Sequence, residues 1–167
     1  MDKKMADTQT VRAAKTRKFD SLEQEAYLSI WRTFDRLRSF DEALFAEWGL
    51  TAQQYNVLRL LQASQPEPMP TLSIAGKLVS RAPDITRMLD KLEESGLIER
   101  TRSATDRRAV LVSITPSGNV VLGEIVDKLK DCHEQQLGHL SATELRSLTQ
   151  LLRKARMPHE PEDSAWR

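Results

Sequence analysis

The feature that most constrains this chain is the run from Thr71 to Gly118, which reads TLSIAGKLVSRAPDITRMLDKLEESGLIERTRSATDRRAVLVSITPSG. Two short stretches with helical apolar spacing come first, and Ser95-Gly96 then interrupts the second of them. Two β-rich stretches follow, and they flank a turn-forming segment that carries several arginines. The run therefore predicts two helices, a tight turn and a two-stranded flap, in that order.

Each predicted helix of this run has a buried face. We expect the first helix to begin at Thr71 as its N-cap, with Gly76 permitting close packing and a buried face of Leu72, Ile74, Ala75 and Leu78. The second helix is expected to begin at Pro83, which the first turn of a helix tolerates, and to end at about Ser95. Its inner face is predicted to hold Ile85, Met88, Leu89 and Leu92, and its outer face Asp84, Thr86, Arg87, Asp90 and Lys91.

The flap is predicted from two short strands, residues 97–100 and 110–114, joined by a tip over residues 102–108. Helix, turn, helix and flap together form the layout of a winged helix-turn-helix. In that layout one helix enters a groove of duplex DNA and the flap reaches the next groove. The fold class we expect is mainly α with a small β-wing (α+β).

Longer helices are predicted on both sides of this run. Residues 20–48 show helical apolar spacing and end at Gly49, and the capping box Thr51-Ala52-Gln53-Gln54 opens another helix. Prolines at 66, 68 and 70 predict a loop over residues 65–70. Thr115-Pro116 predicts a helix that runs to about Gln136, and a capping box at Ser141 and Glu144 opens a last helix, which Pro158 stops.

These elements predict five regions. They are a flexible basic arm (1–19), a dimerisation helix (20–48), a winged helix-turn-helix lobe (49–118), further dimerisation helices (119–157) and a flexible tail (158–167). Tyr27, Trp31, Phe40 and Phe45 widen the apolar surface of the first helix beyond one stripe, which favours a second subunit as its partner.

Composition narrows the class of protein. The chain has 167 residues, a formal net charge of +1 and one cysteine, Cys132. A disulfide framework and a metal site built from several cysteines are thereby excluded. No apolar run is long enough to cross a bilayer and the N-terminus has no signal-peptide pattern, so we expect a cytoplasmic protein without a membrane partner. The basic arm is interpreted as solvated surface, with DNA phosphates as the alternative contact.

The chain resembles the MarR family of bacterial transcriptional regulators. The resemblance lies in LTAQQYNVLRLL (50–61), in RAPDITRMLDKLEESGLIERTRSATDRRAVLVSITPSG (81–118) and in the flanking helices, and it covers roughly residues 22–157. It implies a homodimer whose first and last helices form the dimer base. It also implies a recognition helix from Pro83 to about Ser95 in the major groove, and a flap tipped by Asp106-Arg107-Arg108 in the minor groove. The arm is outside this resemblance.

The candidate DNA contacts lie on three elements. On the recognition helix they are Arg81, Ala82, Pro83, Asp84, Thr86, Arg87 and Lys91, because N-terminal side chains of such a helix read bases. For Asp84 a role at the helix dipole is favoured over base reading. Arg87 and Lys91 are interpreted as phosphate contacts, with a solvated face as the alternative. On the preceding helix Thr71 and Ser73 are candidates for phosphates, although an N-cap role is favoured for Thr71.

The wing candidates are Arg102, Asp106, Arg107 and Arg108. Arg108 is the sharpest of them, because an arginine at a flap tip fits the negative potential of a narrow minor groove. Asp106 would orient an arginine, and Arg102 and Arg107 would contact the DNA backbone. Arg100 is expected to be the most structural of the arginines in this segment.

Enzyme chemistry has no support in the sequence, and we expect no catalytic residue, metal or cofactor. The chain lacks a glycine-rich phosphate loop and any nucleophile elbow. His133 and His139 lie six residues apart and do not share a helical face, so a surface role is favoured over a metal site. Cys132 lies on an apolar helix face, which favours a buried inert thiol over a redox sensor.

The resemblance implies a small-molecule effector, often a phenolic or aromatic acid, bound between the dimer base and the DNA-binding lobe. Tyr27, Trp31, Phe34 and Tyr55 are the candidate lining residues, with plain core packing as the favoured alternative. We therefore expect a ligand-responsive homodimeric repressor that binds a palindromic operator. The alternative is a winged-helix protein-interaction module that does not bind DNA.

Overall fold

The computed structural model describes residues 19–79, 84–104, 106, 109–162, 164 and 166. The chain divides into two compact units, Met1–Arg36 and Leu37–Arg167, and α1 (Leu22–Ala46) runs through the boundary between them. The first unit contributes the exposed N-terminal part of α1. No helix in the described part of the chain is long and apolar enough to cross a membrane.

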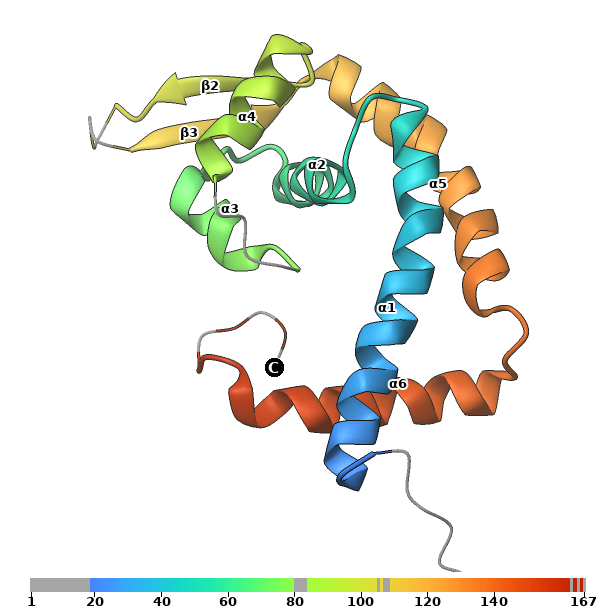
Figure 1. The fold of residues 1–167 in the computed structure, drawn as a ribbon. Coiled ribbons are helices and arrows are strands. Elements are labelled where there is room, and N and C mark those ends of the chain that lie inside the picture. The colour runs from blue at the N-terminus through green and yellow to red at the C-terminus, as the bar shows by residue number, and fades with distance from the viewer. Residues whose placement is uncertain are drawn as a thin grey trace, which may run out of the picture. The chain divides into compact units, whose positions relative to one another are not determined.

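The second unit is mainly helical (Figure 1). After α1 come α2 (Ala52–Ser64), α3 (Thr71–Lys77) and α4 (Ile85–Glu94). Long helices α5 (Pro116–Leu137) and α6 (Ala142–Arg156) follow the strands, and a short 3-10 helix, η1, spans Met157–His159. The fold class predicted from the sequence is confirmed.

The helix boundaries follow from local capping. Capping boxes open α2 at Thr51 and α6 at Ser141, as the sequence predicts, and Thr115 accepts from the amide of Gly118 at the start of α5. Gly49 and Gly96 adopt φ of 64° and 71°, the left-handed conformation that glycine permits where a helix ends. These residues fix where each helix stops and the chain turns.

Within the described residues the sheet has three strands, β1 (Met69–Pro70), β2 (Ile98–Arg102) and β3 (Val110–Ile114), in the order β1-β3-β2. Both pairings are antiparallel, with Met69 opposite Val112 and Ile98 opposite Ile114. The prediction of a loop over residues 65–70 is wrong at its end. Pro70 can join the sheet because β1 is an edge strand, where a missing amide donor costs no ladder bond.

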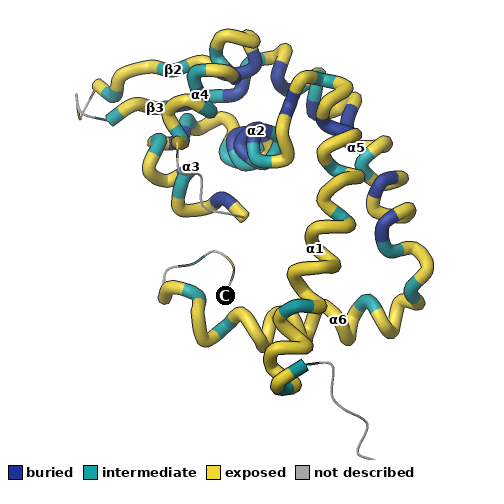
Figure 2. The backbone as a smooth tube through the Cα atoms, viewed as in Figure 1, coloured by how far each residue is buried: buried dark blue, intermediate teal, exposed yellow. Residues whose placement is uncertain are grey.

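The core of the second unit lies around α2, which carries buried residues along its length (Figure 2). Val57, Leu58 and Leu61 pack there with residues from α3, α4, the sheet and α5, among them Ile74, Leu89, Leu92, Val112 and Ile125. By contrast, α6 has no buried residue. The core therefore belongs to the lobe that carries α3, α4 and the wing.

Two predictions for α3 are wrong. Leu72 is 85% exposed, and of the four residues expected on the inner face only Ile74 and Leu78 are buried. The helix is only seven residues long, so it presents too short a face to bury four side chains. Gly76 has nothing within 4 Å of where a Cβ would stand, so close packing does not require glycine there.

The C-terminal part of α1 is fixed to α5 by polar contacts. Gln136 Nε2 donates to the carbonyl of Leu37 at 3.0 Å and to Asp41 Oδ1 at 2.8 Å. Near the helix end, Trp48 Nε1 donates to Glu124 Oε2 at 3.0 Å, and Lys128 Nζ lies 4.8 Å from the centre of the Trp48 ring. This part of α1 and the chain leading into α2 are thereby held against one helix.

Candidate nucleic-acid interface

α4 presents a polar face to solvent and an apolar face to the core. Leu89 and Leu92 are buried, whereas Thr86, Arg87 and Lys91 are exposed. The helix begins at Ile85, with Asp84 as its N-cap, and Asp84 Oδ1 accepts from the amide of Arg87 at 2.9 Å. This cap agrees with the interpretation of Asp84 as a residue that serves the helix N-terminus.

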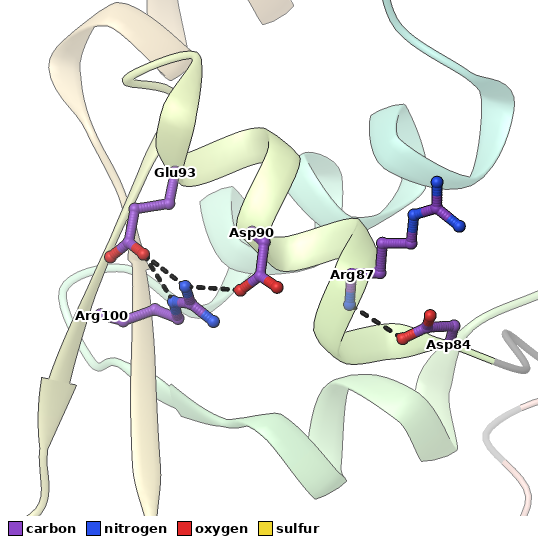
Figure 3. Close-up of polar contacts among 5 residues, drawn as sticks. All are labelled: Asp84, Arg87, Asp90, Glu93 and Arg100. Carbon is purple, nitrogen blue, oxygen red and sulfur yellow. Dashed lines mark hydrogen bonds and ion pairs between the residues drawn. The ribbon is translucent and has the colours of Figure 1, made fainter.

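Arg100 on β2 joins the wing to α4 (Figure 3). Its Nε donates to Glu93 Oε2 at 2.8 Å, and its Nη2 forms an ion pair with Asp90 Oδ1 at 2.7 Å. The hydrogen bond from Arg100 lowers the pKa of the Glu93 carboxyl, and the same bond, with that to Asp90, raises the pKa of the guanidinium. Since Arg100 is half-buried and doubly paired, its role is structural, as the sequence indicates.

The wing turn is held by its own backbone. Ser103 N donates to the carbonyl of Ala109 at 3.0 Å, and Ala109 N donates to the carbonyl of Asp106 at 2.9 Å. Asp106 N in turn donates to Ser103 Oγ at 3.2 Å. Arg102 ends β2 and is exposed, so its side chain is available for a contact outside the lobe.

The beginning of α3 differs from the sequence-based prediction. Its N-cap is Pro70, which makes no side-chain cap, and Thr71 is the first residue of the helix. Thr71 Oγ1 instead donates to the carbonyl of Val110 at 3.3 Å, because the pairing of β1 with β3 brings Thr71 next to that strand. Ser73 is exposed on the same helix.

Five of the predicted contact residues, Arg81, Ala82, Pro83, Arg107 and Arg108, lie outside the described residues. The structure does bring together Thr71 and Thr86, which line a cavity of about 230 Å³ with Arg100 and residues at the base of the wing. Asp84, Arg87 and Lys91 line a second cavity, of about 440 Å³. The candidates on α3 and α4 thus lie along two hollows of one lobe.

The second cavity is also lined by residues for which the sequence predicts no contact with DNA. Thr51, Gln53 and Gln54, from the first turn of α2, line it with Met88. The capping box correctly predicts the start of α2, but the only candidate site residue predicted on this helix is Tyr55, for the effector pocket. A prediction that α2 starts beside α4 would have required knowledge of the tertiary packing.

The aromatic candidates for an effector pocket fall into both units. Tyr27, Trp31 and Phe34 are 60–63% exposed on α1, and the rings of Tyr27 and Trp31 are 6.2 Å apart. Tyr55 stacks on Phe45 with ring centroids 4.8 Å apart and packs against the core of the second unit. Burial raises the pKa of the Tyr55 hydroxyl.

Cys132 is buried on α5, and Asp41 Oδ1 lies 3.7 Å from its sulfur. Burial, with the neighbouring Asp41 carboxylate, raises the pKa of the thiol. Both effects disfavour the thiolate that redox chemistry requires, which supports the interpretation of an inert thiol. Within the described residues, no three His, Cys, Asp or Glu side chains gather closely enough to hold a metal ion.

Comparison with known proteins identifies the family. The MarR family matches residues 50–110, which include α2, α3, α4 and β2. The transcriptional regulator HosA of Escherichia coli O127:H6 is 31% identical over 128 residues, which cover 74% of this chain and 93% of HosA. This chain belongs to the MarR family.

Solved structures place the MarR-family fold on most of the chain. A MarR transcription factor from Planctomyces limnophilus is 50% identical, with a TM-score of 0.66, and the match covers 81% of this chain and 98% of that one. The C80S mutant of Escherichia coli MarR, solved with operator DNA, is 24% identical with a TM-score of 0.71 and the same coverage. At that identity the second likeness shows the fold alone.

Proposed function

We propose that this MarR-family chain is a sequence-specific DNA-binding repressor that works as a homodimer. The observation that carries the proposal is the attachment of β2 to α4 through Arg100, which connects a helix with an exposed polar face to the base of the wing. The exposed face of α4, with Arg87 in its first turn and Lys91 in its last, would lie in the major groove, and the wing would reach the adjacent minor groove.

In the proposed complex the lobe of residues 49–118 contacts DNA, and the helices on either side set the distance between two copies of it. Two recognition helices meet successive major grooves when they are about 34 Å apart. A homodimer with this spacing requires a palindromic operator. Apolar side chains on α1 and α6, including Phe34 and Leu151, are exposed to water in the single chain. Their exposure supports a dimer base, because apolar surface of this kind marks interaction sites.

We further propose a small-molecule effector, in line with the family resemblance. A phenolic or aromatic acid that contacts Tyr27, Trp31, Phe34 or Tyr55 would bind one spacing of the lobes better than another. It would then lower DNA affinity by the difference between its binding free energies to the two states. The exposed indole of Trp31 is the best single candidate, because it offers a large ring and an N–H donor.

The test is a DNA-binding titration with the palindrome nearest to the gene's own promoter and a scrambled duplex as the control. We expect salt-dependent, preferential binding to the palindrome. Arg108→Ala should weaken that binding more than about tenfold, because it removes a cation from the negative potential of a narrow minor groove, and the dimer should stay intact. Unchanged affinity at moderate salt would remove Arg108 from the interface. No DNA binding at all would favour a protein-interaction module.

A further inference from the structure

Two polar side chains are buried in the described part of the chain, those of Gln54 and Gln136, and each is 7% exposed. Gln54 has a local role, because its side chain closes the capping box at the start of α2. Gln136 on α5 has a distant one, since its side chain donates to residues of α1 that lie 95 and 99 positions earlier. Burying a polar group costs free energy unless it is hydrogen-bonded, so the partners of Gln136 decide what it does.

The side-chain amide of Gln136 connects two successive turns of α1. Its Nε2 donates to the carbonyl of Leu37 at 3.0 Å and to Asp41 Oδ1 at 2.8 Å, and a primary amide carries two hydrogens for two such bonds. The same Asp41 oxygen lies 3.7 Å from the sulfur of Cys132, which is a weaker donor. A slip of one residue along a helix is about 1.5 Å, which would break at least one bond from Gln136.

A second set of contacts, just after the end of α1, is more open to water. Trp48 Nε1 donates to Glu124 Oε2 in an exposed hydrogen bond, and the side chains of the ion pair between Lys128 and Glu47 are about half exposed. Exposed pairs of this kind contribute little, and apolar contacts have no preferred direction. The buried amide of Gln136 is therefore the contact that best defines how α1 and α5 align.

The position of this contact in the chain connects it to the proposed dimer. Leu37 is the first residue of the second unit, and α1 continues without a break into the first unit, where its aromatic side chains are exposed. On the other side of the contact, α5 contributes Leu122 and Ile125 to the core of the DNA-binding lobe. The amide of Gln136 thus joins a helix of the proposed dimer base to the helix that enters the lobe.

We propose that Gln136 is a positioning residue for DNA binding. Its bonds to Leu37 and Asp41 fix the register of α5 on α1, and thereby the distance between the two DNA-binding lobes of a dimer. Buried polar residues fix the register of paired helices in the same way, at some loss of stability. This inference rests on the proposed homodimer and adds the residue that defines its spacing. Lobes held at one spacing bind a palindrome without first selecting that spacing from several.

Substitutions at both ends of the contact test the proposal. Gln136→Met removes both N–H donors and fills the same space with a flexible apolar chain. Asp41→Ala removes the carboxylate acceptor, whereas Asp41→Asn keeps an acceptor oxygen and is the conservative variant. Matched controls are Glu42→Ala and Glu42→Gln, because Glu42 is the next residue of α1 and its ion pair with Arg38 is exposed. Thermal unfolding verifies that each variant folds.

The first measurement is the distance between spin labels in the full-length dimer by pulsed electron paramagnetic resonance. The label is attached at Glu94→Cys, because Glu94 is exposed at the end of α4. Cys132 is buried, and the chain without the added cysteine measures its background labelling. We expect one narrow distance distribution for the otherwise unmodified chain, for Asp41→Asn and for both Glu42 variants. Gln136→Met and Asp41→Ala should broaden or displace it.

The second measurement compares affinity for the palindrome nearest to the gene's own promoter with affinity for a duplex that holds a single half-site. We expect Gln136→Met to lose several-fold of the preference for the palindrome, because its two lobes no longer share one spacing. Its affinity for the half-site should stay the same, because the lobe itself is intact. A residue that only stabilised the fold would lower both affinities together and leave the preference unchanged.

The outcomes separate this inference from the proposed function. If Gln136→Met keeps the narrow distribution or the full preference for the palindrome, the positioning role is wrong and the dimeric regulator stands. If Asp41→Asn behaves like Asp41→Ala, the hydrogen bond does not set the register, which also overturns the inference. Should Gln136→Met fail to fold, the two Asp41 variants decide by the same criteria. If the unmodified chain gives no distance between labels because it is a monomer, the proposed homodimer and this inference are both wrong.

Discussion

The guanidinium of Arg100 forms ion pairs with two carboxylates, and both belong to the same helix. Asp90 and Glu93 lie three residues apart on α4, on the side that faces β2. The arginine therefore compensates a repulsion within α4 and at the same time attaches a strand to it. Its removal would leave the two acids close to each other without a cation between them.

We predict that Arg100→Ala lowers the free energy of unfolding by about 1.5–3 kcal/mol, the range for hydrogen bonds to charged groups. Arg102→Ala is the matched control, because Arg102 ends the same strand and is exposed. It should leave the unfolding midpoint unchanged and weaken DNA binding. Urea unfolding and DNA titration of both variants measure the two effects. Equal losses of stability would contradict the role assigned to Arg100.

The same cluster predicts a dependence of stability on pH. Arg100 lowers the pKa of Glu93 in the folded chain below its ordinary value of 4.5. The ionised carboxylate therefore stabilises the fold fully above about pH 4.5, and this contribution is lost as the pH falls through the lower, folded-state pKa. Urea midpoints between about pH 6 and 3 should fall less steeply for Glu93→Gln than for the unmodified chain. Parallel curves would disprove the coupling.

Individual residues are best predicted from the sequence where their contacts are local. Thr51, Thr115 and Ser141 are helix caps where predicted, since a cap depends on atoms within a few residues. The prediction of Thr71 as a helix N-cap is wrong, because its hydroxyl has a partner on β3, about forty residues later in the chain. No local pattern predicts that bond.

At the scale of elements, the start of α5 packs tightly under the wing. A Cβ on Gly118 would meet the carbonyl oxygen of Leu97, and it would lie 2.6 Å from Ile114 Cγ1. The glycine therefore lets the first turn of α5 approach both β3 and the residue that precedes β2. Gly123, further along the same helix, has nothing within 4 Å of where a methyl group would stand, so the two glycines form a natural comparison.

We predict that Gly118→Ala destabilises the lobe by about 1–3 kcal/mol, because backbone must move to admit the methyl group. Gly123→Ala should stabilise it by about 0.5–1 kcal/mol, since alanine is the better helix former and meets no obstacle. Thermal or urea unfolding measures both. If both variants gained stability, the close approach at Gly118 would be excluded.

The sequence predicts which helices and strands exist more fully than it predicts how they pack together. The α-helices of the described chain and both strands of the wing follow from apolar periodicity and caps, whereas β1 is two residues long and contains a proline. Its strand character depends on β3, which no pattern around Met69 reveals. Leu72 shows the same limit, because helical spacing pairs Leu72 with Ala75 and Ile74 with Leu78, and only tertiary contacts decide that the side of Leu72 is exposed.

At the scale of the whole molecule, apolar exposure is concentrated on the helices at the ends of the chain. Tyr27, Trp31 and Phe34 on α1, and Leu151 on α6, are each at least 60% exposed. The dimer base predicted from the sequence consists of these helices. A second copy of the chain would remove this surface from water. Such burial contributes a favourable free energy of roughly 25 cal/mol per Å² of apolar area.

We predict that the 19.0 kDa chain is a dimer in solution by light scattering. Leu151→Glu should shift it toward monomer, because a carboxylate would then be buried in the interface without a partner. Leu72→Glu is the control, since Leu72 is even more exposed but lies on α3, in the predicted DNA-binding lobe. If the unmodified chain is a monomer, the proposed spacing of two DNA-binding lobes is wrong. If both variants have equal effects, the interface does not lie at Leu151.

The order of strands in the sheet has a consequence for biosynthesis. β3 is the central strand, and it pairs with β1 on one side and β2 on the other. The chain leaves the ribosome from its N-terminus, so Met69 emerges well before its partner Val112. A nascent chain that ends before β3 has α2, α3 and α4 but neither strand pairing. One late segment therefore closes the sheet on both sides at once, and a premature stop anywhere before Val110 deprives the nascent lobe of its entire β-structure.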